Sequence, residues 1–541
     1  MDMGMASTKI SGEILLAIDV GTQSTRALAF AATGELIDYA QVVYPAAYFS
    51  PQPGWAEQDP EAYWEWMVQA ASRLWLQGKV RAETVAALAL TTQRSTIVLL
   101  DGEGKPLRPA IVWLDQRRAE KVPPVGIFWS TVFRLAGLQA TLQHLQAEAE
   151  INWLREQEPD LMGRTKHYLL LSGYLNHRLT GQYVDSVGNQ VGYIPFDVRK
   201  QTWTSPGHWK SRALPVERET LPELVPPGAA LGALSAEAAS RLGLTAGLPV
   251  IAAASDKACE VLGSGCLELH QGCVGYGTTA TFIVNSQRYL EPVALVPPYP
   301  SAQSGAFNLE MQTYRGFWMV SWFKEQFAQE DIRLAEAEGV SAEELLERKA
   351  AAVAPGSMGL VLQPFWSPGV RYPGPEAKGA IVGFGGIHTK YHVYRAILEG
   401  LAYAIRDGLE RIEKKSGVPV REVYVSGGGS RSRLVMQITA DVLGLPAIKP
   451  GTEQTSGLGA AILAATGLGW YADLPSAVRG MTRAGESFEP QTDTGRLYDE
   501  LYRRIYLNMY PRLRPLYRAV QQITGYPAFR KGQTVVRVRW F

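Results

Sequence analysis

Short apolar runs separated by polar turns dominate the start of the chain. Residues 14–18 are apolar and β-branched, Asp19 ends the run, and after a polar turn over residues 20–25 the chain is apolar again until Phe30. This pattern predicts a strand, a tight turn and a second strand, with a third strand over residues 36–44. A helix is expected next, because Asp59-Pro60 is a typical helix start followed by apolar side chains at helical spacing.

The same pattern returns in the second half of the chain. Residues 248–254 predict a short buried strand, and Asp256 follows it at the start of a helix. Residues 272–284 then predict another strand, turn and strand, in which Gly277-Thr278-Thr279 resembles Gly21-Thr22-Gln23. A duplicated Gly/Thr hairpin is what a nucleotide clamp with one loop from each half requires.

Helical periodicity is strongest towards the C-terminus. Apolar positions between Tyr394 and Ile412 predict a long amphipathic helix that ends near Gly417. A strand over residues 422–426 leads into the glycine turn 427–430, where a planar ligand or a phosphate could approach the backbone. Residues 457–466 predict a helix of small side chains that can pack closely against another helix.

Composition sets broad limits on the function. The chain has 541 residues, a net charge of +1 and 46% hydrophobic residues, which predicts two large globular domains and argues against a nucleic-acid partner. We find no signal peptide and no run of 18 apolar residues, so a soluble cytoplasmic protein without a membrane partner is expected. The three cysteines lack metal-ligand spacing and are expected to be reduced thiols.

The first turn has the chemistry of an anion site. Gly21 lets a ligand approach the backbone, and Thr22, Ser24 and Thr25 offer hydroxyls beside backbone N–H groups. Because a carboxylate beside phosphates needs a cation between them, Asp19 suggests Mg²⁺. The alternative is an ordinary hairpin with a polar turn.

Taken together, these motifs resemble those of the FGGY carbohydrate kinases over roughly residues 13–480. The resemblance is carried by AIDVGTQSTRA, TTQRSTIVLLD with IVWLDQR, the helix after Asp256, GYGTTA, the segment 383–410 and VSGGGSRSRLVMQITADVLGLP. P-loop and Rossmann interpretations lack their lysine loop and GxGxxG anchors. The resemblance implies an α/β fold of two actin-like (ribonuclease H-like) domains, each with a central mixed sheet, and an ATP and substrate cleft between them.

The implied domain organisation has four parts. Residues 1–12 are a flexible N-terminus, 13–255 an N-terminal kinase domain for acceptor and phosphate, 256–480 a C-terminal nucleotide domain, and 481–541 a basic C-terminal extension. Residues 503–541 hold nine basic and no acidic residues with four interleaved tyrosines, which favours a solvated or subunit-contacting tail. A tail that contacts another subunit would belong to a homodimer. Residues 534–540 alternate like an edge strand.

The resemblance also implies roles for individual residues. Asp256 is the general base and Asp19 helps to position Mg²⁺, since phosphoryl transfer needs a proton acceptor and charge neutralisation. A helix N-terminus would hold Asp256 ionised at a cost in basicity. The acceptor pocket is implied for Gln93, Arg94, Trp113, Asp256 and Lys257, and the ATP site for Gly21, Thr22, Gln23, Ser24, Arg26, Gly277, Thr278, Gly316, Gly428, Gly429 and Ser432.

The acceptor itself is left open by the sequence. The glycerol-specific branch of the family has Arg-Glu and Asp-Gln where this chain has Arg94-Ser95 and Asp256-Lys257, and the xylulose branch has Met-His at the first position. The chain therefore predicts an ATP- and Mg²⁺-dependent kinase of a small-molecule sugar or polyol. The alternatives are a glycerol or xylulose kinase proper, or a non-catalytic ATP-binding regulator of actin-like fold. Lys257 could bind the acceptor or pair with Glu260.

Overall fold

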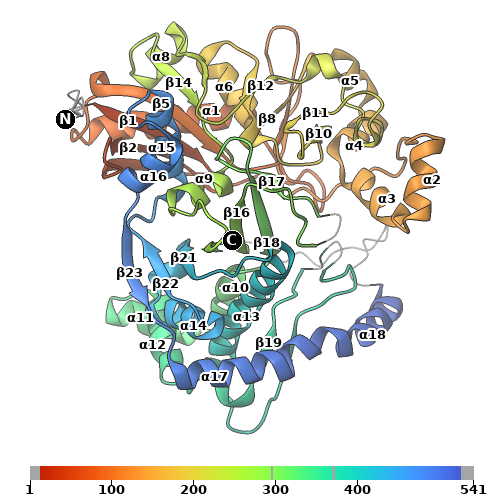
Figure 1. Ribbon diagram of the computed structural model, residues 1–541, viewed down its shortest axis with the longest axis vertical. Helices are drawn as coiled ribbons and strands as arrows, with labels where there is room; N and C mark the ends of the chain where they lie inside the picture. Colours follow the sequence, from red (N-terminus) through yellow and green to blue (C-terminus); the bar gives the residue numbers. More distant parts are fainter. Residues whose placement is uncertain (1–12, 294–295, 368, 370–371, 526–541) are drawn as a thin grey trace, which may run out of the picture.

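The computed structural model describes residues 13–293, 296–367, 369 and 372–525. It is an α/β molecule of two stacked halves, each built on one mixed sheet, with helices on both sides of the N-terminal sheet (Figure 1). The edge strand predicted over residues 534–540 lies outside the described residues. No described helix has the length and apolar character that a membrane span would require.

Six strands form the sheet of the N-terminal half, in the order β13-β14-β5-β1-β2-β3. The three strands predicted at the start of the chain are confirmed as an antiparallel meander, and β5 and β14 extend it in parallel with β1. The strands are β1 (Ile14–Val20), β2 (Ser24–Ala31), β3 (Leu36–Val43), β5 (Val85–Thr92), β13 (Ala230–Ala233) and β14 (Pro249–Ala252).

Strand β1 is buried on both faces, which explains its continuous apolar sequence. Alternate side chains such as Leu16 pack beneath α1 (Pro60–Leu76), α6 (Leu171–Thr180) and α8 (Ala236–Leu242). The other set, including Leu15 and Leu28, packs against α9 (Asp256–Gly263), α15 (Thr455–Gly467) and α16 (Leu474–Met481). Asp59 caps α1 and Pro60 is its first residue, as predicted.

The seven-stranded sheet of the C-terminal half repeats this topology. Its order is β17-β18-β16-β15-β21-β22-β23, in which β18, β16 and β15 are antiparallel, β21 and β22 are parallel to β15, and β23 returns antiparallel. If β17 is left out, the remaining six strands have the same order and directions as the strands of the N-terminal sheet read from β3 to β13. The strands are β15 (Gln271–Tyr276), β16 (Ala280–Ser286), β17 (Tyr299–Pro300), β18 (Phe307–Thr313), β21 (Glu422–Ser426), β22 (Ala447–Pro450) and β23 (Ala484–Phe488).

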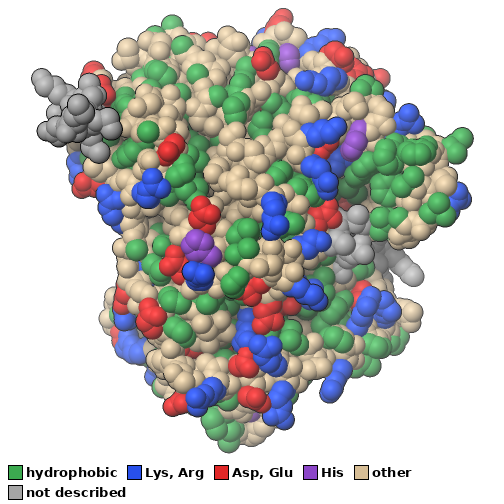
Figure 2. Space-filling view, in the orientation of Figure 1, with side chains coloured by type: hydrophobic (Ala, Val, Ile, Leu, Met, Phe, Trp, Pro, Cys, Tyr) green, Lys and Arg blue, Asp and Glu red, His purple; other side chains and the backbone are tan. Residues whose placement is uncertain are grey.

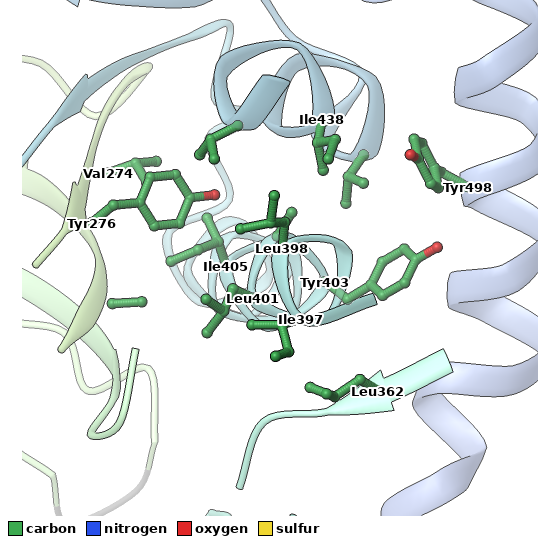
Figure 3. Close-up of a cluster of buried hydrophobic side chains, with 14 of the residues drawn as sticks. Val274, Tyr276, Leu362, Ile397, Leu398, Leu401, Tyr403, Ile405, Ile438 and Tyr498 are labelled. Carbon is green, nitrogen blue, oxygen red and sulfur yellow. The ribbon is translucent and has the colours of Figure 1, made fainter. Parts of the chain in front are cut away.

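The core of the C-terminal half surrounds one long helix, α13 (Lys390–Ser416). Its apolar stripe packs against the sheet residues Val274 and Tyr276 on one side and Tyr498 on the other (Figure 3). The predicted end near Gly417 is confirmed, because Gly417 is a left-handed C-cap. Other helices of this half are α10 (Trp318–Phe327), α11 (Gln329–Glu338), α12 (Ala342–Ala351) and α14 (Arg433–Leu443), and β19 (Val361–Gln363) pairs with β20 (Ala380–Val382).

Helix α9 lies between the two sheets. Ala258, Cys259 and Leu262 belong to the core beneath the N-terminal sheet, whereas Val261 packs with Cys273 of β15. The small-residue helix predicted over 457–466 is α15, and it contacts α9 at backbone distance, since a Cβ on Gly459 would lie 2.1 Å from the Cys259 carbonyl oxygen. All three cysteines are buried free thiols, as predicted.

This contact predicts a large loss of stability for Gly459→Ala. An added methyl group would have to move one of two packed helices, and such overpacking costs typically 1–3 kcal/mol or more. Gly163→Ala in α5 (Pro159–Arg164) is the matched control, because a Cβ there meets no atom within 4 Å. Thermal unfolding should show a lower midpoint for Gly459→Ala and an unchanged or slightly raised midpoint for Gly163→Ala. Equal midpoints would show that the helices separate at little cost.

A smaller four-stranded sheet, β4-β7-β6-β8, extends the N-terminal half beside the main sheet. The helices next to it leave apolar side chains in solvent: Ile127 and Leu135 of α2 are more than 80% exposed, and apolar surface lies at the right edge of Figure 2. The elements here are β4 (Glu57–Gln58), β6 (Ile97–Leu100), β7 (Ala110–Ile111), β8 (His167–Leu170), α2 (Ile127–Leu135), α3 (Gln139–Glu148), α4 (Glu150–Gln157) and the pair β10 (Phe196–Asp197) and β11 (Thr202–Trp203).

Residues 484–524 of the predicted basic extension pack onto the C-terminal half, so this part of it is not a solvated tail. Residues 526–541 lie outside the described residues, and contact of the tail with another subunit stays a prediction. After β23 the chain forms α17 (Thr492–Leu501), one π-helical turn and α18 (Leu507–Thr524). The interleaved tyrosines are the contact residues: Tyr502 and Tyr506 are buried against Tyr403 of α13. The basic residues alternate with these tyrosines because a helix turns one set inward and the other outward.

Candidate functional site

The strands that carry the predicted motifs end at the same edge of their sheets. Parallel strand β1 carries Asp19 as its last but one residue, β5 is followed by the loop with Gln93 and Arg94, and β14 is followed by Asp256. In the other half, parallel strands β15 and β21 end at the Gly277 turn and the 427–430 turn. Polar groups beyond the carboxyl ends of parallel strands are the usual binding site of α/β proteins.

Asp256 is the first residue of α9, and its side chain is half-buried. Oδ1 accepts a hydrogen bond from the backbone N–H of Lys257 at 2.7 Å. Burial raises the pKa of Asp256, and the positive charges of Arg94 and Lys257 act in the opposite direction without cancelling it. This corrects the expectation that the helix terminus would make Asp256 a weaker base, because desolvation is the larger effect.

The Asp19 carboxylate has too little positive charge nearby to offset the cost of its burial. Burial, together with the charges of Asp256 and Glu260, raises its pKa to about 6, and Arg26, 3.3 Å away, compensates only in part. The described residues contain no group of three or more side chains placed to hold a metal by themselves. Mg²⁺ commonly binds one or two carboxylates together with phosphates, and Asp19 fits that kind of site.

The raised pKa predicts that Asp19→Asn stabilises the protein above pH 6. A buried acid that prefers its protonated form contributes stability that is lost as pH rises through its folded pKa. From the ordinary value of 3.8 to about 6 the cost is about 3 kcal/mol at most. Thermal unfolding between pH 4.5 and 8 should show a higher midpoint for Asp19→Asn at pH 8 and convergence with the unmutated protein towards pH 4.5. A constant difference would assign the effect to something other than ionisation.

The first predicted turn is a tight hairpin. Gly21 N–H donates to the Ser24 carbonyl at 3.0 Å, and Trp113 Nε1 donates to Thr22 Oγ1 at 2.9 Å. Trp113, assigned to the acceptor, therefore contacts a residue assigned to ATP. The Thr25 hydroxyl is 2.7 Å from the Tyr44 hydroxyl and fully buried, so it is not available to a phosphate.

Backbone hydrogen bonds and close packing hold the second predicted turn in place. The N–H of Gly277 donates to the Thr279 carbonyl, and its own carbonyl accepts from Phe317 N–H, both at 3.0 Å. Gly316 lies directly against this turn, where a Cβ would be 2.1 Å from the Ala280 nitrogen. A Cβ on Gly277 would meet nothing closer than 3.6 Å, and Thr278 beside it is exposed.

The glycines of the third turn differ from one another. A Cβ on Gly428 would meet no atom within 4 Å, and the residue is exposed. A Cβ on Gly429 would lie 2.5 Å from the Phe317 ring, so this glycine is needed for packing. Ser432 caps α14, since its hydroxyl accepts from Val435 N–H at 3.1 Å. Only Gly428 of the three is open to a ligand.

Two predicted acceptor residues already have protein partners. Gln93 is buried and donates from Nε2 to the Tyr63 hydroxyl at 3.0 Å. Arg94 binds Glu310 of β18 through two hydrogen bonds of 3.0 and 3.3 Å, and its guanidinium lies 4.9 Å from the centre of the Tyr299 ring. The sequence interpretation missed Glu310 and Tyr299. One carboxylate inside the strand FNLEMQT was the only signal for Glu310.

Ser95, beside Arg94, has a left-handed backbone with φ of 58°. Its hydroxyl donates to the Val191 carbonyl at 3.1 Å. This conformation is costly for a residue with a Cβ, and such residues are enriched at active sites and ligand sites. The Ser95 loop is therefore held in place by the segment around Val191.

Lys257 pairs with Glu260, which is one of the two roles expected for it from the sequence. Its ammonium is 2.5 Å from Glu260 Oε2, and both side chains are largely buried. The other oxygen, Oε1, accepts a hydrogen bond from Ser426 at the end of β21. The charge of Lys257 is therefore used within the protein, and the pair ties the base helix α9 to the strand that precedes the 427–430 turn.

Comparison with known proteins gives a consistent result. The chain matches the model "FGGY family of carbohydrate kinases, N-terminal domain" over residues 14–263 and the corresponding C-terminal domain model over 272–468. It is 28% identical to the xylulose kinase of Lactococcus lactis, covering 91% of this chain and 96% of that protein. It is 29% identical to the glycerol kinase of Dechloromonas aromatica, covering 89% and 94%.

The structural comparison agrees with the sequence comparison. The crystal structure of xylulose kinase from Rhodospirillum rubrum superimposes with a TM-score of 0.76 at 27% identity, over 94% of this chain and 100% of that one. Relatives with different acceptors are equally similar, so the comparisons do not distinguish between acceptors. The two-domain actin-like fold, its duplicated sheets and the matches over both halves agree, and the chain belongs to the FGGY family of carbohydrate kinases.

Proposed function

We propose that this kinase transfers the γ-phosphoryl group of Mg-ATP to a hydroxyl of a sugar or polyol, with Asp256 as general base. The supporting observation is the position of Asp256: it is the first residue of α9, the helix between the two sheets, and desolvation raises its pKa. A base with a raised pKa accepts the proton of an alcohol more readily.

In the proposed step Asp256 takes the proton of the acceptor hydroxyl. The bond between that oxygen and the γ-phosphorus forms as the bond from the γ-phosphorus to the bridging oxygen breaks, and ADP leaves. The Gly21 and Gly277 turns would hold the phosphates with backbone N–H groups, and Gly428 would border the adenosine. Mg²⁺ bound with ATP would neutralise phosphate charge beside Asp19. Movement of the two halves towards each other would exclude water as a competing acceptor.

The proposal is tested by ADP release with a panel of polyols, ketoses and aldoses. Glycerol should be a poor acceptor and a larger polyol or ketose a better one. Ser95 is a short side chain, and Glu310 already occupies the Arg94 guanidinium, so few groups remain to bind the hydroxyls of a small molecule. Each unpaired polar group costs roughly 1–3 kcal/mol. The highest kcat/KM with glycerol would contradict this choice of acceptor.

A second candidate function is a non-catalytic ATP-binding regulator. Its signature would be ATP binding without acceptor-stimulated ADP release, and the same panel measures both. The presence of both carboxylates, Asp19 and Asp256, favours the enzyme. A cytoplasmic location and a homodimer stay predictions.

A further inference from the structure

A cavity of about 170 Å³ lies beside the proposed acceptor site. Its wall combines the segment around Val198, the turn at Tyr299 and the β18 residue Glu310, and Arg94 and Lys210 contribute the positive charges. None of the residues predicted from the sequence, apart from Arg94, lies in this wall.

Arg94 connects the cavity to the general base. Arg94 forms part of its wall and is the strongest of the positive charges acting on Asp256. The segment that carries the cavity wall is joined to the start of α9, since Ser255 N–H donates to the Gly188 carbonyl at 3.1 Å. An acceptor with one hydroxyl at Asp256 would therefore extend past Arg94 into this space.

The volume sets the size of what can enter. Cavities of about 150 Å³ in other proteins hold a benzene ring, which has six heavy atoms. A cavity of about 170 Å³ can thus take three carbons with their oxygens. The whole acceptor would then have about six carbons, three of them on the base side of Arg94.

The charges of the wall are not balanced. Arg94 is matched by Glu310, 3.0 Å away. Lys210 donates to the Phe196 carbonyl at 3.0 Å, but it forms no salt bridge with any residue in the described part of the chain. Asp197 and Glu291 lie close enough to favour its charged form, yet burial has the larger effect and lowers the pKa of Lys210. A half-buried ammonium without an ion pair is partly desolvated at a cost, and an anionic ligand group would relieve that cost.

We propose that this cavity binds the far end of the acceptor and that Lys210 pairs there with a carboxylate, so that the acceptor is a sugar acid of about six carbons. The inference rests on the kinase activity proposed above and adds the chemical class of its substrate. Hydroxyl groups on the carbon chain of the acceptor would meet Tyr299. The hydroxyl of Tyr299 is buried without a hydrogen-bond partner among the described residues.

The charge is tested with Lys210→Met and a matched pair of acceptors, a six-carbon aldonic acid and the alditol of the same length. The unmutated protein should prefer the acid by at least about tenfold in kcat/KM, a difference of 1.4 kcal/mol. Lys210→Met should lose that preference and keep its kcat/KM for the alditol and its KM for ATP. The control is Lys324→Met, which removes a lysine paired with Glu343 on the surface.

The cavity is tested with Val198→Phe, which fills it. This variant should lose at least about tenfold in kcat/KM for the six-carbon acid and much less for a three-carbon acid, because only the longer chain reaches the cavity. Val216→Phe is the control, since Val216 lines a separate cavity of about 200 Å³ with Arg155 and Met162. Unfolding midpoints show whether each variant is folded.

The outcomes separate the two proposals. If acceptors stimulate ADP release but Lys210→Met affects the acid and the alditol equally, or Val198→Phe affects long and short acids equally, the sugar-acid site is wrong and the kinase proposal stands. If no acceptor stimulates ADP release from the unmutated protein, both are wrong. Loss of the acid preference in Lys210→Met together with loss of the long acid in Val198→Phe supports the site.

Discussion

Asp256→Asn should lower kcat on the best acceptor by at least about a hundredfold, the usual scale for loss of a general base. Asparagine has the shape of aspartate, but its amide does not accept a proton at the pH of the assay. Because Asp256 is half-buried and its pKa is raised, the neutral amide removes a partly desolvated charge and is not expected to unfold α9. The KM for ATP should change little.

Three measurements define this result. Steady-state ADP release gives kcat, isothermal titration gives the ATP affinity, and an unfolding scan confirms that the variant is folded. Asp256→Glu is a useful second variant, since it keeps a carboxylate but moves it by one methylene. Its activity should lie between that of Asp256→Asn and that of the unmutated protein. Near-normal turnover of Asp256→Asn would remove this residue from the mechanism.

Gly277→Val should weaken ATP binding by at least about tenfold, or 1.4 kcal/mol, with far less effect on the acceptor. The residue lies at the bend between β15 and β16, where the proposed phosphate would touch the backbone. We expect the fold to accept the change, because a Cβ meets nothing closer than 3.6 Å and φ is not left-handed. A side chain here would therefore take space from the ligand and not from the fold.

Gly207→Val is the control for this variant, because Gly207 also lies in a loop with no atom within 4 Å of an added Cβ. Isothermal titration with ATP compares the two. Unchanged nucleotide affinity in a folded Gly277→Val protein would mean that the second Gly/Thr turn only connects two strands. The same substitution at Gly316 would not be informative, since it would displace Ala280 and unfold the turn.

The sequence was most informative where local chemistry determines structure. Neighbouring residues determine the hairpin at Gly21, the N-cap at Asp59 and the C-cap at Gly417. All three predictions are confirmed. The family was predictable for the same reason, because its motifs are short turns at strand ends. The duplicated sheets followed from two similar hairpins at the start of each half.

Pairings between distant segments were not predictable. Arg94 and Glu310 are 216 residues apart, and the bond from Ser426 to Glu260 spans 166. Nothing near Arg94 in the chain indicates that its guanidinium is already bound. The tyrosines after residue 501 were misinterpreted because their spacing suits both a solvated helix and a buried one, and only contact with α13 decides between them.

The position of α15 beneath the N-terminal sheet has a consequence for biosynthesis. The last parallel strand of that sheet ends at Ala252, but α15 begins at Thr455. At 5–20 residues per second a ribosome needs about 10–40 s to make the intervening 202 residues. During that time the face with Leu15 and Leu28 has no cover from α15, so a nascent chain exposes an apolar surface to chaperones or aggregation. A fragment that stops after α9 would keep that surface permanently, and the two halves of this kinase should be produced only as one polypeptide.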